Sequence, residues 1–505
     1  MKRPRTGIDV GAALDLVGGV LKWLAPAFLL PVVVAIGYGE SCWWAFVVAA
    51  VITGVAGWTL DQITGDKEGA AVTPRESFLV VALLWLLIPM FGALPYILDG
   101  GPVLSRPIDA YFEAVSGFTA TGATLVPKVE ALDRSMLFWR QLSHWLGGMG
   151  IIVLAVAILP RLRIGGRQLL QSELAGPTEI EQLGDTIRET ARRLWRLYVV
   201  LTLIAIAVLG FIGWSGLDEE LTFFDAVGHA LSVVALGGFS TRTISVAAFA
   251  PITQYVILVF MIIAGINFLR LYRFFVQRRF DVLTRDEELR LYLALIVIGT
   301  ILIAIEVIGG GYEEGEAGIR HSLFQATAIL TTTGFATADY AVWGPLATVT
   351  LLLLMFSGAS AGSTGGGIKI IRHLLLFKLV RRELEQTVHR EAIVPIRANK
   401  RVVDEKALRS TIVFVLLYLV TFAVGALGLV ADARRAGEDL SAFDAFGAAA
   451  ACLGNVGPAF GFAGPYGSFA PFSDLSTWIC TVLMWLGRVE IIPVVVILTR
   501  AYWRS

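Results

Sequence analysis

Long apolar runs recur from one end of the sequence to the other, and they limit the fold more than any other feature. The chain has 505 residues, of which 56% are hydrophobic and 16% charged, and its mean hydropathy is +0.72. An apolar helix of about 20 residues crosses a hydrocarbon core of ~30 Å. Because helices satisfy their own backbone hydrogen bonds in lipid, we predict an all-α polytopic membrane protein. Ten spanning helices are expected, at 10–36, 41–60, 76–98, 135–160, 195–214, 252–277, 289–309, 345–380, 408–430 and 474–500.

The charges of the connecting segments predict an orientation. Segments 161–196, 270–290 and 372–409 are rich in arginine and lysine, whereas "GWSGLDEELTFFD" and "GGGYEEGEAGIR" are acidic. Basic connections stay in the cytoplasm, so both termini are expected there. The basic connections have two interpretations, ordinary positive-inside charge or docking of a regulatory partner.

Four short, half-apolar segments on the outer side repeat one pattern: "IDAYFEAVSGFTATGAT", "FDAVGHALSVVALGGFST", "RHSLFQATAILTTTGFAT" and "FDAFGAAAACLGNVGPAF". Each has a reference glycine: Gly122, Gly238, Gly334 and Gly457. We therefore predict four pseudo-symmetric helix–pore-loop–helix repeats around one pore, after two additional N-terminal helices. The expected units are the extension 1–70, the pore repeats 71–165, 190–280, 286–382 and 405–505, and the cytoplasmic connections 166–189 and 383–404.

Each repeated segment is expected to re-enter the membrane. About ten residues precede its polar end, and at about 1.5 Å per residue such a helix reaches roughly half-way across the bilayer. Non-helical backbone at that depth must be buried in protein or line a water-filled cavity. Four such ends around one axis would give a ring of carbonyls that attracts cations, with helix C-termini adding negative partial charge. Alternatively, the glycines are ordinary turn glycines and the threonine hydroxyls bond local backbone.

The residues thirteen positions before the reference glycines are predicted to cap the re-entrant helices. Aspartate accepts hydrogen bonds from the free N–H groups at a helix start, and Asp109, Asp225 and Asp444 occupy this position. Attraction of cations at the outer mouth is their second interpretation. The third copy has "RHS" instead, so its cap is expected to be Ser322 or His321.

The stretch "SGASAGSTGGGIK", residues 357–369, interrupts the expected helix 345–380 with glycine, serine and alanine. Such a composition does not form a stable continuous span. We predict a flexible intramembrane loop that opens and closes the path; a tight helix crossing or a tolerated kink are the alternatives. The expected gate residues are Gly358, Ser360, Gly362, Ser363, Thr364, Gly365, Gly366, Gly367 and Lys369, together with Arg488 of the last span. "GSTGGGIK" lacks the GK[ST] ending of a nucleotide loop, so no nucleotide is expected on this chain.

Few other side chains indicate chemistry. Arg488 lies inside the last expected span, where a charge is costly; it could form an electrostatic barrier near the pore, snorkel to a helix end or pair with Glu490. His144 is interpreted as a packing residue, and the three cysteines, which lack metal-site spacing, as buried small residues. A membrane enzyme would need convergent His, Asp, Glu or Cys groups at membrane depth, and the segments offer mainly backbone and hydroxyls. The chain is therefore not expected to be an enzyme.

The segments ending "TATGAT", "LGGFST", "TTTGFAT" and "LGNVGPAFG", with "GSTGGGIKIIR" and "LGRVEIIPVVVIL", together resemble the TrkH/KtrB/HKT superfamily of potassium transporters, the TrkH type most closely. The resemblance covers almost the whole chain. It implies a potassium translocator of the bacterial plasma membrane, homodimeric and regulated by a cytoplasmic nucleotide-binding subunit of the TrkA (RCK) type.

The resemblance also implies an ion site, held by carbonyls at and just before each reference glycine. The implied residues are Ala120, Thr121 and Gly122; Leu236, Gly237 and Gly238; Thr332, Thr333 and Gly334; Asn455, Val456 and Gly457. Glycine in all four copies favours potassium over sodium. A sodium-permeable or ion-coupled symporter of the same superfamily is the alternative, although no dedicated carboxylate in mid-membrane is evident.

Overall fold

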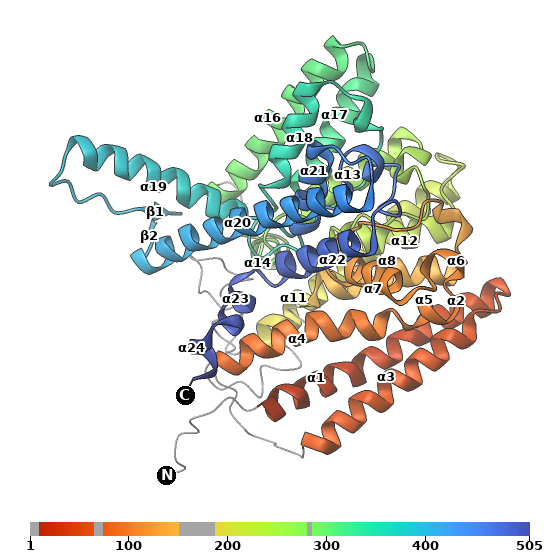
Figure 1. Ribbon diagram of the computed structural model, residues 1–505. Helices are drawn as coiled ribbons and strands as arrows, with labels where there is room; N and C mark the ends of the chain where they lie inside the picture. Colours follow the sequence, from red (N-terminus) through yellow and green to blue (C-terminus); the bar gives the residue numbers. More distant parts are fainter. Residues whose placement is uncertain (1–9, 65–73, 151–186, 280–284, 505) are drawn as a thin grey trace.

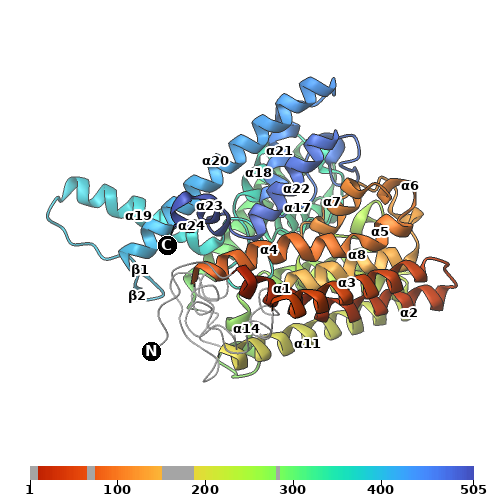
Figure 2. The same cartoon turned by 60° about the horizontal axis from the view of Figure 1, so that its bottom comes forward.

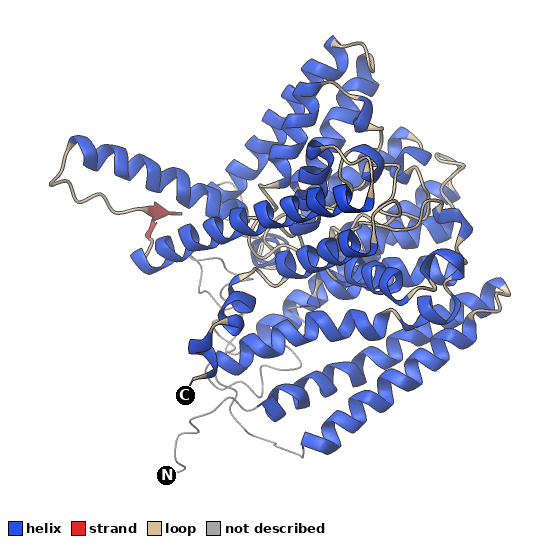
Figure 3. Ribbon diagram, in the orientation of Figure 1, coloured by secondary structure: helices blue, strands red, loops and turns tan. Residues whose placement is uncertain are grey.

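The computed structural model describes residues 10–64, 74–150, 187–279 and 285–504. This part of the chain is almost entirely helical, and its only sheet is a two-stranded hairpin (Figure 3). The prediction of an all-α polytopic fold is confirmed. Among the described residues, six helices or continuous helical stretches are long and apolar enough to cross a membrane, and two bent helix pairs raise that number to at most eight.

The described elements fall into groups along the chain. The first group is α1 (Val10–Leu24), η1 (Ala25–Phe28), α2 (Leu29–Tyr38) and α3 (Trp43–Thr64). The second is α4 (Pro74–Gly92), α5 (Leu94–Asp99), α6 (Gly101–Leu104), α7 (Pro107–Phe118), η2 (Val129–Ala131) and α8 (Arg134–Gly148). The third is α11 (Ile187–Trp214), α12 (Phe223–Ala235), η5 (Ser245–Ala248), α13 (Pro251–Ala264) and α14 (Phe268–Phe275).

Two further groups complete the chain. One is α16 (Glu287–Gly309), α17 (Gly315–Leu330), η6 (Tyr340–Val342), α18 (Pro345–Met355) and α19 (Ile370–Val388), followed by β1 (Arg397–Ala398) and β2 (Arg401–Val402). The other is α20 (Glu405–Ala436), α21 (Ala442–Leu453), η7 (Gly461–Ala463), α22 (Asp474–Arg488), α23 (Ile492–Leu498) and α24 (Arg500–Trp503).

Three of the ten expected spans are broken rather than continuous. The expected break in 345–380 separates α18 from α19. Two spans predicted as continuous are wrong: α13 and α14 meet at 103°, and α22 and α23 at 109°. Each bent pair taken as a whole is apolar enough for one span, so hydrophobicity alone did not reveal the breaks. The last part of the expected span 135–160, from residue 151 on, lies outside the described residues. Most of the expected connection 166–189, up to residue 186, lies outside them as well.

The four short helices α7, α12, α17 and α21 lie inside the bundle, and the long helices surround them (Figures 1 and 2). Helices α1 to α3 lie along one side of the bundle, whereas α19 and the start of α20 project from it with the β hairpin (Figure 1). On α16, Leu293, Val297, Ile301 and Ile305 are 42–58% exposed. Such a run of exposed apolar side chains on a long helix suits contact with lipid.

Candidate ion pathway

The four short helices end in the same backbone motif. Each helix is followed by a non-glycine residue in the left-handed region, and two positions later by a reference glycine that also has positive φ. The φ values are 53° and 88° at Ala120 and Gly122, 54° and 82° at Leu236 and Gly238, 59° and 76° at Thr332 and Gly334, and 54° and 101° at Asn455 and Gly457. We call residues 120–122, 236–238, 332–334 and 455–457 the glycine segments.

The hydrogen bonds of the four helix ends also match. In each copy the N–H of the residue before the reference glycine donates to a carbonyl five residues earlier, which is the bond of a Schellman cap. The four bonds, of 2.8–3.0 Å, are Thr121 to Ser116, Gly237 to Ser232, Thr333 to Ala328 and Val456 to Ala451. These N–H groups thus donate to carbonyls of their own helix, and none of them donates to a carbonyl of the glycine segments.

The reference glycines bring the four segments together in a closed ring. A Cβ on Gly122 would lie 2.4 Å from the Gly237 carbonyl oxygen, and a Cβ on Gly238 would lie 2.0 Å from that of Thr333. A Cβ on Gly334 would lie 2.0 Å from the Val456 oxygen, and a Cβ on Gly457 would lie 2.5 Å from that of Thr121. Each glycine therefore lies against the carbonyl of the next copy, and the fourth copy closes on the first.

The carbonyls of this ring receive no hydrogen bond from the part of the chain that the structure describes. Among the described residues, no N–H or hydroxyl donates to the carbonyl oxygens of the glycine segments. Thr121, Thr333 and Val456 are nevertheless fully buried. Buried carbonyls without a donor are costly, and a cation that exchanges part of its hydration shell for them removes that cost.

Side chains of the glycine segments bond to protein rather than pointing freely into the path. The Thr119 and Thr121 hydroxyls lie 2.6 Å apart, and those of Thr331 and Thr333 lie 2.7 Å apart. Asn455 donates from Nδ2 to the Thr121 hydroxyl at 2.9 Å and to the Met484 carbonyl at 2.9 Å. These contacts fix the segments, so the oxygens without a donor there are the backbone carbonyls and Oδ1 of Asn455, which is buried and accepts no hydrogen bond from the described residues.

Two cavities lie close to the ring or to the stretch between α18 and α19. One contains Gly122, Gly238 and Gly334, and is lined further out by Arg140 and Arg242. The other is lined by the glycines and Ser363 of the stretch between α18 and α19, and by Lys369, Arg488 and Glu490. The first cavity thus adjoins the reference glycines, and the second, which we call the inner cavity, adjoins the stretch between α18 and α19.

The stretch between α18 and α19, residues 356–369, which we call the intramembrane loop, lies directly beneath the glycine segments. The Gly366 N–H donates to the Thr332 hydroxyl at 2.7 Å, and the Thr364 hydroxyl donates to the Val234 carbonyl at 3.1 Å. A Cβ on Gly366 would lie 2.7 Å from the Gly454 oxygen. The loop therefore contacts the ends of three of the four short helices.

Two cations bond to carbonyls of this loop. Arg488 donates from Nη1 to the Thr364 carbonyl and from Nη2 to the Gly147 carbonyl, both at 3.0 Å. The Lys369 ammonium donates to the Gly365 carbonyl. Glu490 pairs with Arg372, so the interpretation of Arg488 as the partner of Glu490 is wrong. The contact of Arg488 with a loop carbonyl is compatible with an electrostatic barrier, which stays a prediction.

Comparisons with known proteins agree with this arrangement. A family profile described as "TrkH: Cation transport protein" matches residues 45–504. The chain belongs to the TrkH family. Over 503 residues it is 36% identical to the Trk system potassium uptake protein TrkH of Salmonella typhimurium, covering 98% of this chain and 99% of that protein. It is 35% identical to the Trk system potassium uptake protein TrkG of Escherichia coli, over 96% and 97% of the two chains.

A solved structure is similar over the same length. The crystal structure of the potassium transporter TrkH from Vibrio parahaemolyticus matches with a TM-score of 0.85 and 31% identity, covering 98% of this chain and 100% of that one. This TrkH family member is therefore a multi-pass membrane transport protein and not an enzyme.

The predicted caps are wrong by three residues in this TrkH family member. Helix α12 is capped by Thr222, and Asp225 is its third residue, completing a capping box; α21 is likewise capped by Ser441, with Asp444 in its first turn. Asp109 is the third residue of α7, after Pro107. The aspartates still favour the helix N-termini by their charge.

The third copy departs further from the cap prediction. Helix α17 begins at Gly315, so Ser322 and His321 lie inside it and cap nothing. His321 instead bonds through Nδ1 to the Thr337 hydroxyl at 2.9 Å, three residues after the reference glycine. Asp225 makes the equivalent bond with the Thr241 hydroxyl at 2.5 Å. In these two copies the residue ties the returning chain to its helix.

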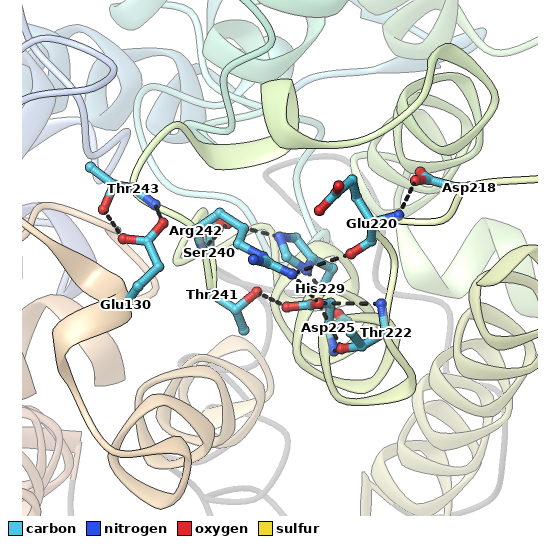
Figure 4. Close-up of polar contacts among 10 residues, drawn as sticks. All are labelled: Glu130, Asp218, Glu220, Thr222, Asp225, His229, Ser240, Thr241, Arg242 and Thr243. Atoms are coloured by element: carbon cyan, nitrogen blue, oxygen red, sulfur yellow. Dashed lines mark hydrogen bonds and ion pairs between the residues drawn. The ribbon is translucent and has the colours of Figure 1, made fainter.

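In the second copy this tie extends into a network (Figure 4). Arg242 donates to the Asp225 carboxylate at 2.9 Å and to the Glu220 carbonyl at 3.2 Å. Nearby, Glu130 from the first copy accepts from the Thr243 N–H at 2.7 Å (Figure 4). The outer rims of two neighbouring copies are thus joined by side chains.

A buried ion pair behind the first glycine segment was missed in the sequence. Glu113 of α7 and Arg140 of α8 lie 2.8 Å apart and are 0% and 1% exposed. Glu113 also accepts from the Thr124 hydroxyl at 2.9 Å and the Leu125 N–H at 3.0 Å. The available signal was a charge inside each of two apolar helices, "YFEAV" and "FWRQL".

Proposed function

We propose that this chain carries potassium across the plasma membrane through the ring of the four glycine segments. The observation that carries the proposal is the closed circuit of buried carbonyls that accept no hydrogen bond from the described residues. Carbonyl dipoles can replace the water shell of a weakly hydrated monovalent cation. The twelve residues of the glycine segments form the ion site, within repeats that span 71–165, 190–280, 286–382 and 405–505.

Potassium is the preferred ion because glycine occupies the reference position in all four copies and because similar proteins are named potassium uptake proteins. The alternative is sodium permeation or ion-coupled symport through the same path. Gly122→Ser tests the choice, since its side chain would displace the Gly237 carbonyl. We expect a lower ratio of rubidium to sodium flux than in the parent.

A matched control separates that effect from backbone strain. Gly216 has a similar φ of +74°, but a Cβ there would meet nothing within 4 Å. Gly216→Ser should keep the parent flux ratio. An unchanged ratio in Gly122→Ser, with normal expression, would count against the assignment of the ion site.

The intramembrane loop is the gate of this path. It lies across the inner side of the ring, and Arg488 and Lys369 hold two of its carbonyls. Their positive charges oppose cation passage there. A variant lacking part of residues 358–366 should show a higher resting rubidium flux. A well-folded variant with equal or lower flux would contradict the gate.

A cytoplasmic nucleotide-binding subunit of the TrkA (RCK) type regulates the gate, the protein is a homodimer, and both termini are cytoplasmic. The Trk system naming of relatives supports a partner, and the basic connections support the orientation. Growth of a potassium-uptake-deficient bacterium at low potassium, with and without a co-expressed nucleotide-binding subunit, tests uptake and regulation together. If the chain restores growth to the same extent with and without the nucleotide-binding subunit, uptake is supported and regulation by that subunit is contradicted.

A further inference from the structure

One buried carboxylate reaches the intramembrane loop from the side. Glu288, in the first turn of α16, is 1% exposed, and its Oε1 accepts from the Ala361 N–H at 2.7 Å. Its Oε2 accepts from Arg270 Nη1 at 3.2 Å, and Arg270 is itself 3% exposed. A hydrogen bond from a backbone N–H to a charged carboxylate is stronger than a neutral one. Glu288 therefore fixes the loop at Ala361.

The same cluster extends to a second carboxylate. Arg270 also pairs with Asp286, the N-cap residue of α16. Asp286 Oδ1 accepts from the Leu289 N–H at 2.6 Å, which holds the start of the helix. The position of Glu288 is consequently set by Asp286 through both the helix start and the shared arginine.

The outer end of the cluster lies in the β hairpin. Asn399 donates from Nδ2 to Asp286 Oδ2 at 3.0 Å and accepts from the Glu287 N–H at 2.9 Å. Asn399 and Lys400 have φ values of 50° and 67°, as in the tight two-residue turns that define hairpins. Because the turn restricts Asn399, its amide is held in one place against α16.

A parallel contact joins the hairpin to the helix that follows the loop. Lys378 of α19 pairs with Glu287 and donates to the Arg397 carbonyl at 2.6 Å. The loop is thus held on one side through Ala361 and on the other through α19, and both contacts lead to the hairpin. Val402 of the hairpin is 63% exposed, so this element is accessible from outside.

We propose that Asn399, Asp286 and Glu288 are positioning residues for the intramembrane loop, and that the β hairpin controls the loop through them. The inference rests on the proposed function, because it takes the loop to be the gate. A displacement of the hairpin would remove Asn399 from Asp286, loosen the start of α16 and release the Glu288 contact with Ala361.

The test measures loop accessibility and transport in the full-length protein. Ser363 lines the inner cavity and is partly exposed, whereas the three native cysteines are all buried. In the detergent-solubilised Ser363→Cys variant, a small polar thiol reagent is therefore expected to label the cysteine at position 363 rather than the buried native cysteines. Its labelling rate reports the opening of the loop, and rubidium uptake in cells reports transport.

Asn399→Asp removes the donor to Asp286 and places a negative charge beside it. We expect labelling of Ser363→Cys to become about threefold to tenfold faster, which corresponds to the loss of one hydrogen bond. Adding Asp286→Asn reverses donor and acceptor and should restore the rate to within about twofold, since asparagine is also a good N-cap. Lys400→Ala, on the same turn but exposed, should leave the rate unchanged.

Each outcome decides the inference. Equal labelling in Asn399→Asp and Lys400→Ala, or no rescue by Asp286→Asn, overturns it. If Asn399→Asp does not fold, Glu288→Gln serves instead, because it keeps an acceptor for Ala361 while weakening the pair with Arg270; unchanged labelling then overturns it. Faster labelling with unchanged rubidium uptake supports the positioning role and contradicts the gate, so the two failures are distinguishable.

Discussion

Arg372 in the first turn of α19 pairs with Glu490 in the break between α22 and α23, with Nη2 of Arg372 lying 2.5 Å from Oε2 of Glu490. Arg372 belongs to α19, after the intramembrane loop, and its guanidinium lies 3.8 Å from the centre of the Phe414 ring. Glu490 and Ile491 both have positive φ, 62° and 56°, a strained conformation for residues with a side chain. The ion pair therefore stabilises the bend between α22 and α23.

Arg372→Ala should destabilise this bend. We expect the free energy of unfolding to fall by about 1–3 kcal/mol, because Glu490 would keep a half-buried charge without its partner. Thermal unfolding in detergent measures the effect. Arg381→Ala, an exposed arginine on the same helix, is the control and should change the midpoint little. Equal midpoints for the two variants would show that the pair does not hold the bend.

Gly237→Ala should impair transport through a steric contact that a second substitution relieves. A Cβ on Gly237 would lie 2.2 Å from His144 Nδ1, and the His144 ring packs against Phe239 at 4.2 Å. The single variant should lose most rubidium uptake, because the Gly237 carbonyl must move.

The double variant Gly237→Ala with His144→Ala should recover part of that uptake at equal expression. His144→Ala alone should mainly lower stability, since it leaves a cavity. If the double variant transports no better than Gly237→Ala, the contact with His144 is not what positions this carbonyl.

Glu113→Gln should be strongly destabilising. Glu113 and Arg140 are fully buried, and breaking a buried pair leaves an uncompensated charge that costs about 3–5 kcal/mol. The thermal unfolding midpoint in detergent should fall markedly. Lys22→Ala removes an exposed pair with Asp61, of 2.8 Å, and should cost at most about 1 kcal/mol. Similar losses in the two variants would contradict a structural role for the buried pair.

Acid should weaken the join between the first two outer rims at Glu130. Partial burial raises the pKa of this carboxyl, but hydrogen bonds from Thr243 and from the backbone of Glu130, together with the charge of Arg242, lower it more, so the pKa lies below its ordinary value. A carboxyl whose pKa is lowered by folding stabilises the folded state at every pH above its ordinary pKa. This stabilisation is lost as the pH falls through the pKa of the folded state.

Glu130→Gln should remove that part of the pH dependence. Thermal unfolding midpoints measured from pH 7 down to about pH 3 should fall less steeply in the variant than in the parent. Parallel curves would mean that Glu130 does not contribute to acid sensitivity.

The sequence was most informative where a pattern is repeated within the chain. Four glycines at one offset mark the same position in each copy, and the φ values found there, 76–101°, are alike. The family and the helical membrane fold, predicted from motifs and hydropathy, are confirmed.

Features that depend on tertiary contacts were not accessible in this way. The bend at 489–491 is stabilised by Arg372, more than a hundred residues earlier in the chain, and local apolarity gives no sign of it. The cap prediction assigned the aspartate of each segment as the N-cap of its helix. In α12 and α21 the N-caps are Thr222 and Ser441, three positions before the aspartates. His321 looked like a replacement cap, but its partner Thr337 is reached only after the chain returns.

The ring of glycine contacts has a consequence for how such a protein can diverge. The space beside each reference glycine is filled by a carbonyl of the following copy, and never by its own. A substitution at Gly122 must therefore be accommodated around Gly237, and one at Gly457 around Thr121. Compensating changes should link successive repeats rather than positions within one repeat. The four repeats are therefore expected to change in sequence in neighbouring pairs, in the cyclic order of the ring.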